Sequence, residues 1–417
     1  MSNHRPSAAS AAATRRQMLR RLGLAATAVY AAPALLNLAP ARATSGSFSS
    51  ASGRRRGARR RRRAAPEFVL AVPTPADLER VTAAGYRVVA SGRVGLIQSE
   101  LARVRSRRGR TLAQARAEIT SLVPAALFDL NHLYRPNALT CHADGCTAFE
   151  LIGWTQRPAD CGLSPSIGMI DTAVDTAHPA LRGGRLEVVG TVSGDRRPSS
   201  RVHGTAVAAL LIGRPDARTP GLLPRARLVA VDAFHADGRG DATDAFDLVR
   251  AIDTLVARNV SVMNMSFAGP ANMLLEHTVA SASARGVALV AAAGNGGPHA
   301  SPLYPAAYRS VLAVTAVDRN SRVYRQAARG RHISFAAPGV RLWTADGRDG
   351  RLRSGTSYAA PFVTAAVAAG LAAAPNRPLA DILAQLAEDA VDLGPAGRDN
   401  TFGWGLVRVD IECPVAR

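Results

Sequence analysis

Lysine is absent from this chain of 417 residues, so arginine supplies all 52 basic side chains. We interpret this bias, together with the abundance of alanine, as a property of the coding sequence and not of the function. Aromatic residues make up only 5% of the chain, and Trp154, Trp343 and Trp404 are scattered along it. The stacking platform of a nucleic-acid binder is therefore not indicated.

Acidic residues are absent from the first 65 positions, which carry 14 Arg, whereas the rest of the chain has 38 Arg against 31 acids. Two thirds of the net charge of +21 thus lie in the N-terminal stretch. Without that stretch the case for a polyanionic partner is weak, so we expect no nucleic-acid partner. The alternative of a basic, surface-bound structural protein would need the Arg-rich stretch as its working part.

Cysteine is rare, and the four in the chain are Cys141, Cys146, Cys161 and Cys413. They lack the Cys-x-x-Cys spacing of a zinc site, and the histidines have no clustered partners, so we expect no metal centre. An even number of cysteines fits two disulfides in an exported protein. Three pairings are possible. We favour Cys141 with Cys146 and Cys161 with Cys413, and four free thiols remain the alternative.

Residues 1–43 have the pattern of an export signal. Arg15-Arg16 precede a moderately apolar run over 22–39, and Ala41-Arg42-Ala43 is a small-x-small cleavage site. The paired arginines resemble a twin-arginine signal. Gly23 and Pro33 interrupt the apolar run, so we expect a cleaved leader with transient membrane contact. The protein would then be periplasmic or secreted, and retention as a membrane anchor stays open.

A small folded unit is predicted over 66–136, after an Arg-rich stretch at 44–65 that indicates a disordered linker. The order strand, helix, strand, strand, helix, strand is typical of a small α+β domain, and nothing in it indicates catalysis. Capping signals at Thr74 and Thr111 begin its two helices. The expected strands cover 68–72, 86–90, 94–104 and 128–134.

The main domain is predicted over 137–417 and has an α/β pattern. Continuous apolar strands that alternate with helices indicate a mostly parallel sheet with helices on both faces, and sites in such sheets form at the carboxyl ends of strands. The predicted strands cover 167–170, 228–234, 260–265, 287–293 and 311–317, and the predicted helices include 242–257 and 272–285.

Ser357 is a candidate nucleophile. It lies in the small-residue stretch Gly355-Thr356-Ser357-Tyr358-Ala359-Ala360-Pro361, at the start of an apolar helix expected over 362–374. At a helix N-terminus, free N–H groups and the helix dipole favour the negative charge that acyl transfer develops on oxygen. The alternative is that Ser357 only caps the helix.

Three other polar residues follow strands or begin helices. Asp171 ends the first predicted strand, where an acid can orient an imidazole, and a plain turn is the alternative. His203 begins a small-residue helix, and one ring nitrogen could be held by a carboxylate while the other takes a proton. Asn295 follows a strand in Gly294-Asn295-Gly296-Gly297, where its amide could donate to an oxyanion, although such a sequence usually only turns.

The order Asp171, His203, Asn295 and Ser357 resembles the subtilisin-like serine peptidases. The resemblance covers 151–411. It implies that Ser357 attacks the scissile carbonyl, His203 takes its proton, Asp171 holds His203, and Asn295 stabilises the oxyanion, with no cofactor required. The supporting motifs are Ile170-Asp171-Thr172, His203-Gly204-Thr205, Asn264-Met265-Ser266-Phe267, Ala293-Gly294-Asn295, the stretch from Gly355 to Pro361, Ala337-Pro338-Gly339-Val340 and Gly405-Leu406.

The resemblance also implies how polypeptide substrates bind. Ser266-Phe267-Ala268 and Gly238-Arg239-Gly240 match the two family segments that pair with extended substrate backbone, and Gly294 belongs to the same site. Ala268 stands where many members have Gly at the mouth of the primary specificity pocket, so we expect its methyl group to disfavour the largest substrate side chains.

We expect the protein to be a monomer.

The unit at 66–136 resembles a subtilase propeptide in position, size and element order. The resemblance implies that this propeptide is a partner of the peptidase domain and that Asp129–Pro136 occupies the cleft. Cleavage between Tyr134 and Phe149 would follow. A catalytically silent relative that binds exported peptides is the alternative, although it would have no reason to keep all four site residues.

One departure from the family concerns calcium. Ala180 stands where many members have a calcium-binding acid, and the connection from Gly213 to Pro224 is shorter than the usual calcium loop. We therefore do not expect the usual tight calcium site, and whether structural calcium binds elsewhere is left open.

Overall fold

The computed structural model describes residues 67–106, 110–136, 139–140, 148–154, 164–192, 195–218, 220–347 and 350–409. The export signal, the Arg-rich linker and all four cysteines lie outside these residues. The leader and the disulfide pairings therefore stay predictions.

The N-terminal part is a four-stranded antiparallel sheet in the order β2-β3-β1-β4 with two helices. The predicted element order is confirmed, and capping boxes at Thr74 and Thr111 begin the helices. The extended segment predicted over 94–104 is interrupted by a turn at 95–98. The elements are β1 Glu67–Val72, α2 Pro75–Ala83, β2 Arg87–Val94, β3 Ser99–Arg105, α3 Leu112–Leu122 and β4 Leu127–Leu130.

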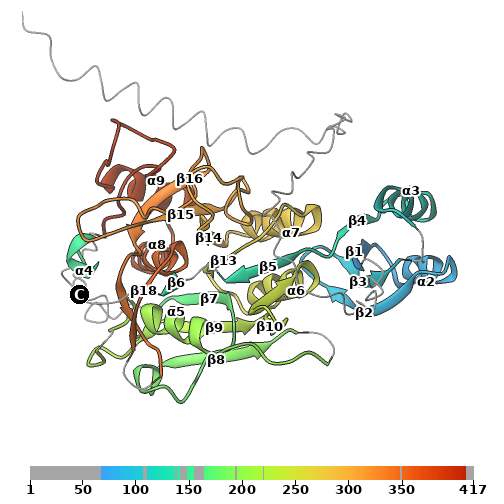
Figure 1. Ribbon diagram of the computed structural model, residues 1–417, viewed down its shortest axis with the longest axis horizontal. Helices are drawn as coiled ribbons and strands as arrows, with labels where there is room; N and C mark the ends of the chain where they lie inside the picture. The colour runs from blue at the N-terminus through green and yellow to red at the C-terminus, as the bar shows by residue number, and fades with distance from the viewer. Residues whose placement is uncertain are drawn as a thin grey trace, which may run out of the picture. The chain divides into compact units, whose positions relative to one another are not determined.

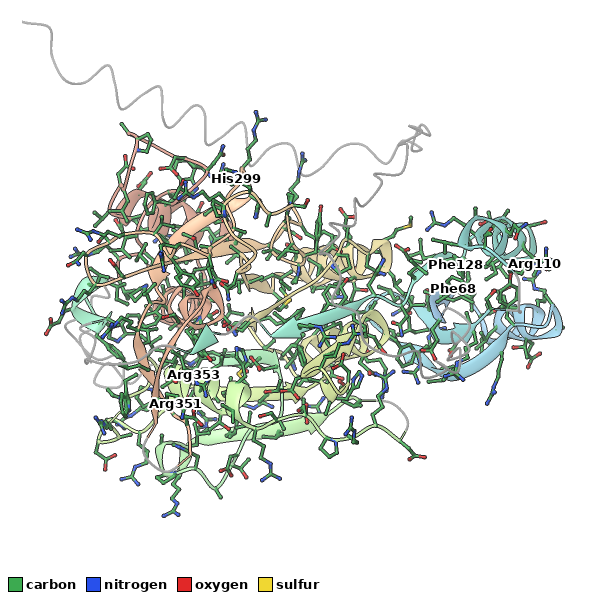
Figure 2. All side chains as sticks on the ribbon, viewed as in Figure 1. Phe68, Arg110, Phe128, His299, Arg351 and Arg353 are labelled. Carbon is green, nitrogen blue, oxygen red and sulfur yellow. The ribbon has the colours of Figure 1, made fainter. Side chains whose placement is uncertain are left out.

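Strand β1 is apolar from Phe68 to Val72, where both of its faces are buried. Phe68 belongs to a core between the small sheet and its own helices, where its ring lies 4.9 Å from that of Phe128 (Figure 2). Val69 and Ala71, which point to the opposite face, join the core of the larger domain. The small sheet is thus packed between its own helices and the larger domain.

The larger domain is built on a seven-stranded sheet in the order β16-β15-β14-β12-β7-β9-β8 (Figure 1). Every strand pair in it is parallel, which confirms the predicted fold class. The strands are β7 Ser166–Asp171, β8 Arg185–Gly190, β9 Arg227–Asp232, β12 Val262–Met265, β14 Ala288–Ala292, β15 Leu312–Val317 and β16 Ile333–Pro338.

Helices cover both faces of this sheet. One core joins the sheet to α5 and α8, and a second core joins its other face to α6 and α7. Alternate residues of β7 enter different cores, with Met169 in the first and Ile170 in the second. The helices are α4 Ala148–Leu151, α5 Val202–Ile212, α6 Ala245–Ala257, α7 Met273–Ala284, α8 Thr356–Ala373 and α9 Leu379–Asp389, with a short 3-10 turn, η2, at Pro179–Leu181.

Among the helices that the structure describes, α8 alone is long and apolar enough to cross a membrane, but 78% of its apolar window is buried inside the protein. It packs against β12, β14, β15 and β16. We therefore interpret α8 as a core helix.

Short strands form two further sheets, in the orders β10-β11-β5-β13 and β17-β18-β6. They correct two predictions. The strand predicted over 128–134 is divided into β4 and β5, and the helix predicted from 242 begins only at Ala245, because the preceding residues pair with β5. The strands are β5 Leu133–Pro136, β6 Leu139–Thr140, β10 His235–Ala236, β11 Asp241–Asp244, β13 Phe267–Ala268, β17 Leu342–Thr344 and β18 Arg351–Ser354.

Gly204 brings the start of α5 against the end of β7. A Cβ atom at this position would lie 2.2 Å from the backbone oxygen of Thr172 and 2.7 Å from that of Ala173. The N–H of Gly204 donates to the Thr172 hydroxyl at 2.9 Å. Only glycine permits this approach, which sets the distance between His203 and Asp171.

The replacement Gly204→Ala is expected to lower the free energy of unfolding by about 1–3 kcal/mol, because the methyl group overlaps backbone atoms that cannot rotate away. Guanidinium unfolding in a Ser357→Ala background, which prevents self-digestion, measures the change. The control is Gly190→Ala, since a Cβ there has no neighbour within 4 Å. Equal losses in the two variants would contradict the explanation.

Candidate active site

Asp171 and His203 are joined at the carboxyl edge of the parallel sheet. Asp171 is the last residue of β7, and His203 is the second residue of α5. The Nδ1 atom of His203 lies 2.6 Å from Oδ1 of Asp171, which also accepts the N–H of Thr172 at 2.7 Å. Both side chains are buried. The carboxylate is thereby held so that Nδ1 carries the proton and Nε2 can accept one.

Ser357 is the second residue of α8 and is fully buried. Its backbone carbonyl accepts the hydroxyl of Ser266 at 2.8 Å. The Ser266 hydroxyl in turn accepts the amide of Asn264 at 2.9 Å, and Asn264 accepts the hydroxyl of Thr364 at 3.0 Å. This chain of hydrogen bonds ties the start of α8 to the end of β12.

His203 and Ser357 come from helices that pack against each other, α5 and α8. The ring of Tyr358, next to Ser357, lies 5.4 Å from the His203 ring between centroids. Burial raises the pKa of the Tyr358 hydroxyl. Within the described part of the chain, His203 Nε2 makes no hydrogen bond to Ser357 or to any other residue. Catalytic hydrogen bonds are often long before substrate binds.

Asn295 follows β14 and is oriented by Thr356. Its side-chain oxygen accepts both the N–H and the hydroxyl of Thr356, each at 3.1 Å. The same hydroxyl accepts the N–H of Gly294 at 3.1 Å. Because the amide oxygen of Asn295 faces Thr356, its amide nitrogen points away from Thr356. Thr356 lies in the same motif as Ser357, but nothing in the motif indicates its role toward Asn295.

A second carboxyl group, Asp232, lies beside Asp171. The two residues are partners in the register of β7 and β9. Asp232 accepts the hydroxyl of Ser199 at 3.1 Å and the N–H of Phe234 at 3.3 Å. Burial, with a smaller contribution from the charge of Asp171, raises the pKa of the Asp232 carboxyl. The sequence pattern offered no signal for this acid.

Strand β5 lies in the predicted substrate cleft, between β13 and β11. Its partners on one side are Phe267 and Ala268. On the other side they are Thr243 and Asp244, and not the predicted segment Gly238–Gly240. That segment instead forms the turn between β10 and β11, closed by a hydrogen bond from the N–H of Asp237 to the oxygen of Gly240 at 2.9 Å.

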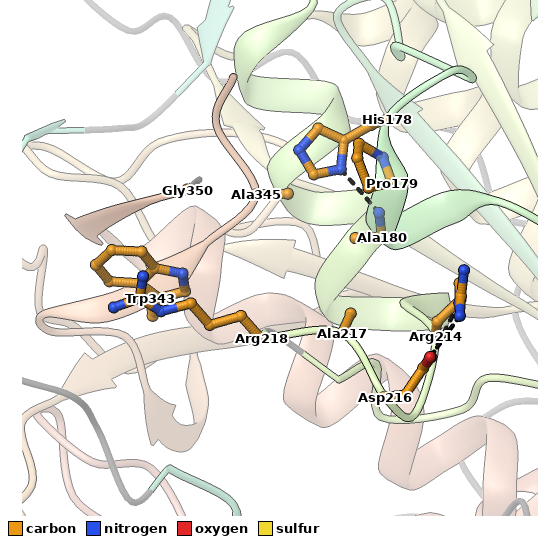
Figure 3. Close-up of a pocket in the computed structure, with 10 residues that line it drawn as sticks. All are labelled: His178, Pro179, Ala180, Arg214, Asp216, Ala217, Arg218, Trp343, Ala345 and Gly350. Atoms are coloured by element: carbon orange, nitrogen blue, oxygen red, sulfur yellow. Dashed lines mark hydrogen bonds and ion pairs between the residues drawn. The ribbon is translucent and has the colours of Figure 1, made fainter. Parts of the chain in front are cut away.

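A separate cavity of about 230 Å³ lies at Ala180 (Figure 3). This is the position at which many family members have a calcium-binding acid and at which we expected no tight calcium site. Among the described residues that line it are the guanidinium groups of Arg214 and Arg218, and Arg218 lies over the Trp343 ring at 3.8 Å. The one lining carboxylate, Asp216, is paired with Arg214. Calcium takes six to eight oxygen ligands, so these residues do not fit a calcium ion.

A parallel α/β sheet whose edge holds an Asp-His pair, with a serine at the start of a neighbouring helix, defines the class of α/β serine hydrolases. The model of the subtilase family matches residues 162–405. The chain therefore belongs to the subtilase family, the family of the subtilisin-like serine endopeptidases.

Two relatives illustrate the similarity. The minor extracellular protease Epr of Bacillus subtilis is 31% identical over 250 residues, which cover 59% of this chain and 38% of that protein. Subtilisin DY of Bacillus licheniformis is 31% identical over 259 residues, which cover 60% of this chain and 90% of that protein. The chain thus spans well under half of Epr but most of subtilisin DY.

Two solved structures are similar in fold. Fervidolysin from Fervidobacterium pennivorans, a keratinolytic enzyme related to subtilisin, matches 86% of this chain and 63% of its own with a TM-score of 0.69 at 22% identity. A mutant of the protease domain of PatA matches 59% of this chain and 92% of its own with a TM-score of 0.53 at 30% identity.

Proposed function

We propose that the protein is an exported serine endopeptidase that hydrolyses polypeptides through an acyl-enzyme. The observation that carries the proposal is the buried hydrogen bond of 2.6 Å between His203 and Asp171, next to the helix that bears Ser357. The leader-like sequence at 1–43 and the extracellular relative support export.

In the proposed reaction, the Ser357 hydroxyl oxygen bonds to the scissile carbonyl carbon while His203 Nε2 takes its proton. Asp171 stabilises the imidazolium that forms. The tetrahedral intermediate then expels the amine, which receives the proton from His203. Water, activated by the same imidazole, hydrolyses the acyl-enzyme and restores Ser357.

The oxyanion that develops in each half of the reaction needs donors placed in advance. The start of α8 supplies the N–H of Ser357 and the positive end of the helix dipole. The amide nitrogen of Asn295 is the second proposed donor, and Thr356 orients it.

The replacement Asn295→Leu is expected to lower kcat about 100- to 1,000-fold with little change in KM, the range known for loss of such a donor in subtilisin. Leu has a similar size but offers no hydrogen bond to the transition state. Steady-state hydrolysis of a peptide substrate measures the effect, with the exposed Asn320→Leu as control. A change confined to KM would argue against the oxyanion role.

We also propose that the unit at 66–136 is the prosegment of the peptidase at 137–417. Side chains at and just after the end of β4 accept N–H groups from the first residues of α6 and α7. Asp129 accepts the N–H of Met273 at 3.1 Å, at the start of α7, and Asn131 accepts the N–H of Phe246 at 3.1 Å, at the start of α6. Acidic and amide oxygens at these positions satisfy free helix N–H groups.

A buried ion pair adds to this contact. Arg103 of β3 lies 3.4 Å from Asp244, the N-cap residue of α6, and both side chains are almost fully buried. Asp244 is shared with Arg196, at 2.6 Å. Loss of one partner from a buried pair leaves an uncompensated charge, so the contact favours one docking position of the small sheet.

The course of the chain supports cleavage between Pro136 and Leu139, a narrower interval than the sequence indicated. Strand β5 ends at Pro136 in the cleft. Strand β6 begins at Leu139, which pairs with Ser354 of β18, three residues before Ser357. The two strands that flank this interval thus pair with β13 and with β18, the strand that leads to the proposed catalytic serine.

Labelling with a fluorophosphonate, followed by peptide mass mapping, tests the proposed activity. We expect label on Ser357 in the native protein and none after heat denaturation, because only the assembled site activates the hydroxyl. N-terminal sequencing is expected to find a mature chain that starts after Pro136 and no later than Leu139. A folded protein that neither matures nor takes the label would overturn the proposal and favour a silent peptide-binding relative.

A further inference from the structure

Strand β5 fills the cleft, so the contacts of its side chains indicate which substrate side chains the cleft accepts. Strand β5 is held as an extended strand between two strands of the larger domain, so its side chains alternate between two directions. Tyr134 is fully buried against the Phe267 ring, with 6.1 Å between ring centroids. Arg135, the next residue, points to the other side and stays partly exposed.

Arg135 meets an acid there, Asp237, for which the sequence pattern gave no signal. Its guanidinium group forms an ion pair and a hydrogen bond with the carboxylate of Asp237. A second guanidinium nitrogen donates to the backbone oxygen of Asp241 at 3.4 Å. One carboxylate and one carbonyl thus face the same guanidinium group, a geometry that suits Arg better than a smaller or neutral side chain.

Asp237 is held in place by its own turn. Its N–H donates to the oxygen of Gly240 at 2.9 Å, and its other carboxylate oxygen accepts the N–H of Arg239 at 2.8 Å. The hydrogen bond with Arg135, then that with Arg239, lowers the pKa of the Asp237 carboxyl to about 2. The turn therefore holds the carboxylate in one orientation through backbone hydrogen bonds.

We infer that Asp237 is a specificity-determining residue that selects substrates with an arginine at the position that pairs with Ala268. This inference rests on the proposed function and adds to it a substrate class, extended peptides with a buried aromatic residue followed by Arg. The neighbouring Arg239 and Arg353 line the same cleft near His203 and disfavour a cation there, and the acid among its described lining residues, Asp241, already accepts the N–H of Ser200. Asp237 is then the group that makes a cation favourable at this one position.

Internally quenched peptides based on residues 133–140 of this chain test the inference. Three versions carry Arg, Gln or Glu at the position of Arg135, and mass spectrometry confirms that each is cut at one bond. We expect kcat/KM for the Arg peptide to exceed that for the Gln peptide about three- to tenfold, and the Glu peptide to be the poorest. The ratio should shrink between about 50 and 500 mM salt, because the pair is partly exposed.

The replacement Asp237→Asn keeps the turn, since the amide oxygen can still accept the N–H of Arg239, but removes the charge. We expect it to bring the Arg-to-Gln ratio to about one. The control Asp216→Asn removes an exposed, paired carboxylate that does not line the cleft and should preserve the ratio.

Equal rates with Arg and Gln in the unaltered enzyme, or an Arg preference that survives Asp237→Asn, would overturn the inference while leaving peptide hydrolysis intact. Failure to cut any of the three peptides, in contrast, would count against the proposed function itself.

Discussion

The replacement Ser357→Ala is expected to produce a chain that keeps its prosegment and shows no measurable peptide hydrolysis. The loss should be about a millionfold in kcat, the magnitude known for the same change in subtilisin, because the remaining groups have no nucleophile to activate. Self-cleavage should stop as well, so the prosegment stays covalently in the cleft. Both effects follow from one missing oxygen atom.

Intact mass and N-terminal sequencing, beside a peptide assay, measure these outcomes. The fold should survive, because the Ser357 backbone keeps its hydrogen bond from Ser266, and circular dichroism checks this. The matched control is Ser281→Ala in α7, where the exposed hydroxyl donates to the backbone oxygen of His277 in its own helix. A purified Ser357→Ala chain that still loses its prosegment would show that another group, or another protease, cuts it.

The replacement Asp171→Asn is expected to lower kcat about 10,000-fold. An amide nitrogen in place of Oδ1 would donate to Nδ1 of His203 and reverse the ring tautomer, so Nε2 would carry a proton and could not accept one from Ser357. If the amide oxygen stays at that position, it no longer stabilises the imidazolium by charge. KM should change little, because Asp171 is buried behind the ring.

The rate of self-cleavage should fall by a similar factor, because the same imidazole serves both reactions. A time course of prosegment loss and steady-state peptide hydrolysis measure the two rates. The control is Asp175→Asn on the following loop, whose carboxylate accepts only the N–H of Ala177 in the described contacts. If Asp171→Asn impaired peptide hydrolysis but left self-cleavage at its normal rate, the two reactions would need different catalytic groups.

These predictions separate chemistry from recognition. Ser357 and Asp171 are expected to act on kcat, whereas Asp237 is expected to act on the choice of peptide. The prosegment connects the two, because the strand that would be cut beside Ser357 also presents Arg135 to Asp237. The prosegment strand would then have the sequence features that the enzyme prefers in its substrates.

Local rules were sufficient for much of the fold. Thr74 and Thr111 each accept the N–H three residues on, and these capping boxes involve only neighbours in the sequence. The parallel sheet could be predicted because strands buried on both faces form continuous apolar runs, as in residues 167–170 of β7 and in all of β14. Asp171 and Asn295 could be found because Asp171 ends β7 and Asn295 lies in the turn after β14.

The boundaries of other helices and strands depended on strand pairing with segments that are distant in the sequence. Residues Asp241–Asp244 are compatible with the start of a helix, yet they form β11 because Thr243 and Asp244 pair with β5, a strand from a distant part of the sequence. The same pairing separates β5 from β4. No local pattern marks the break between β4 and β5, whereas the N-cap Asp244, which accepts the N–H of Asp247, is a local mark of the start of α6.

By itself the sequence determined the family, the parallel α/β class and the four polar residues of the candidate site, because each belongs to a short motif with its own local physics. Only the tertiary structure decided that Thr356 orients Asn295, that Asp232 lies beside Asp171, and that Asp237 faces Arg135. These are contacts between distant segments, and they depend on strand register and helix packing, which a linear pattern does not contain.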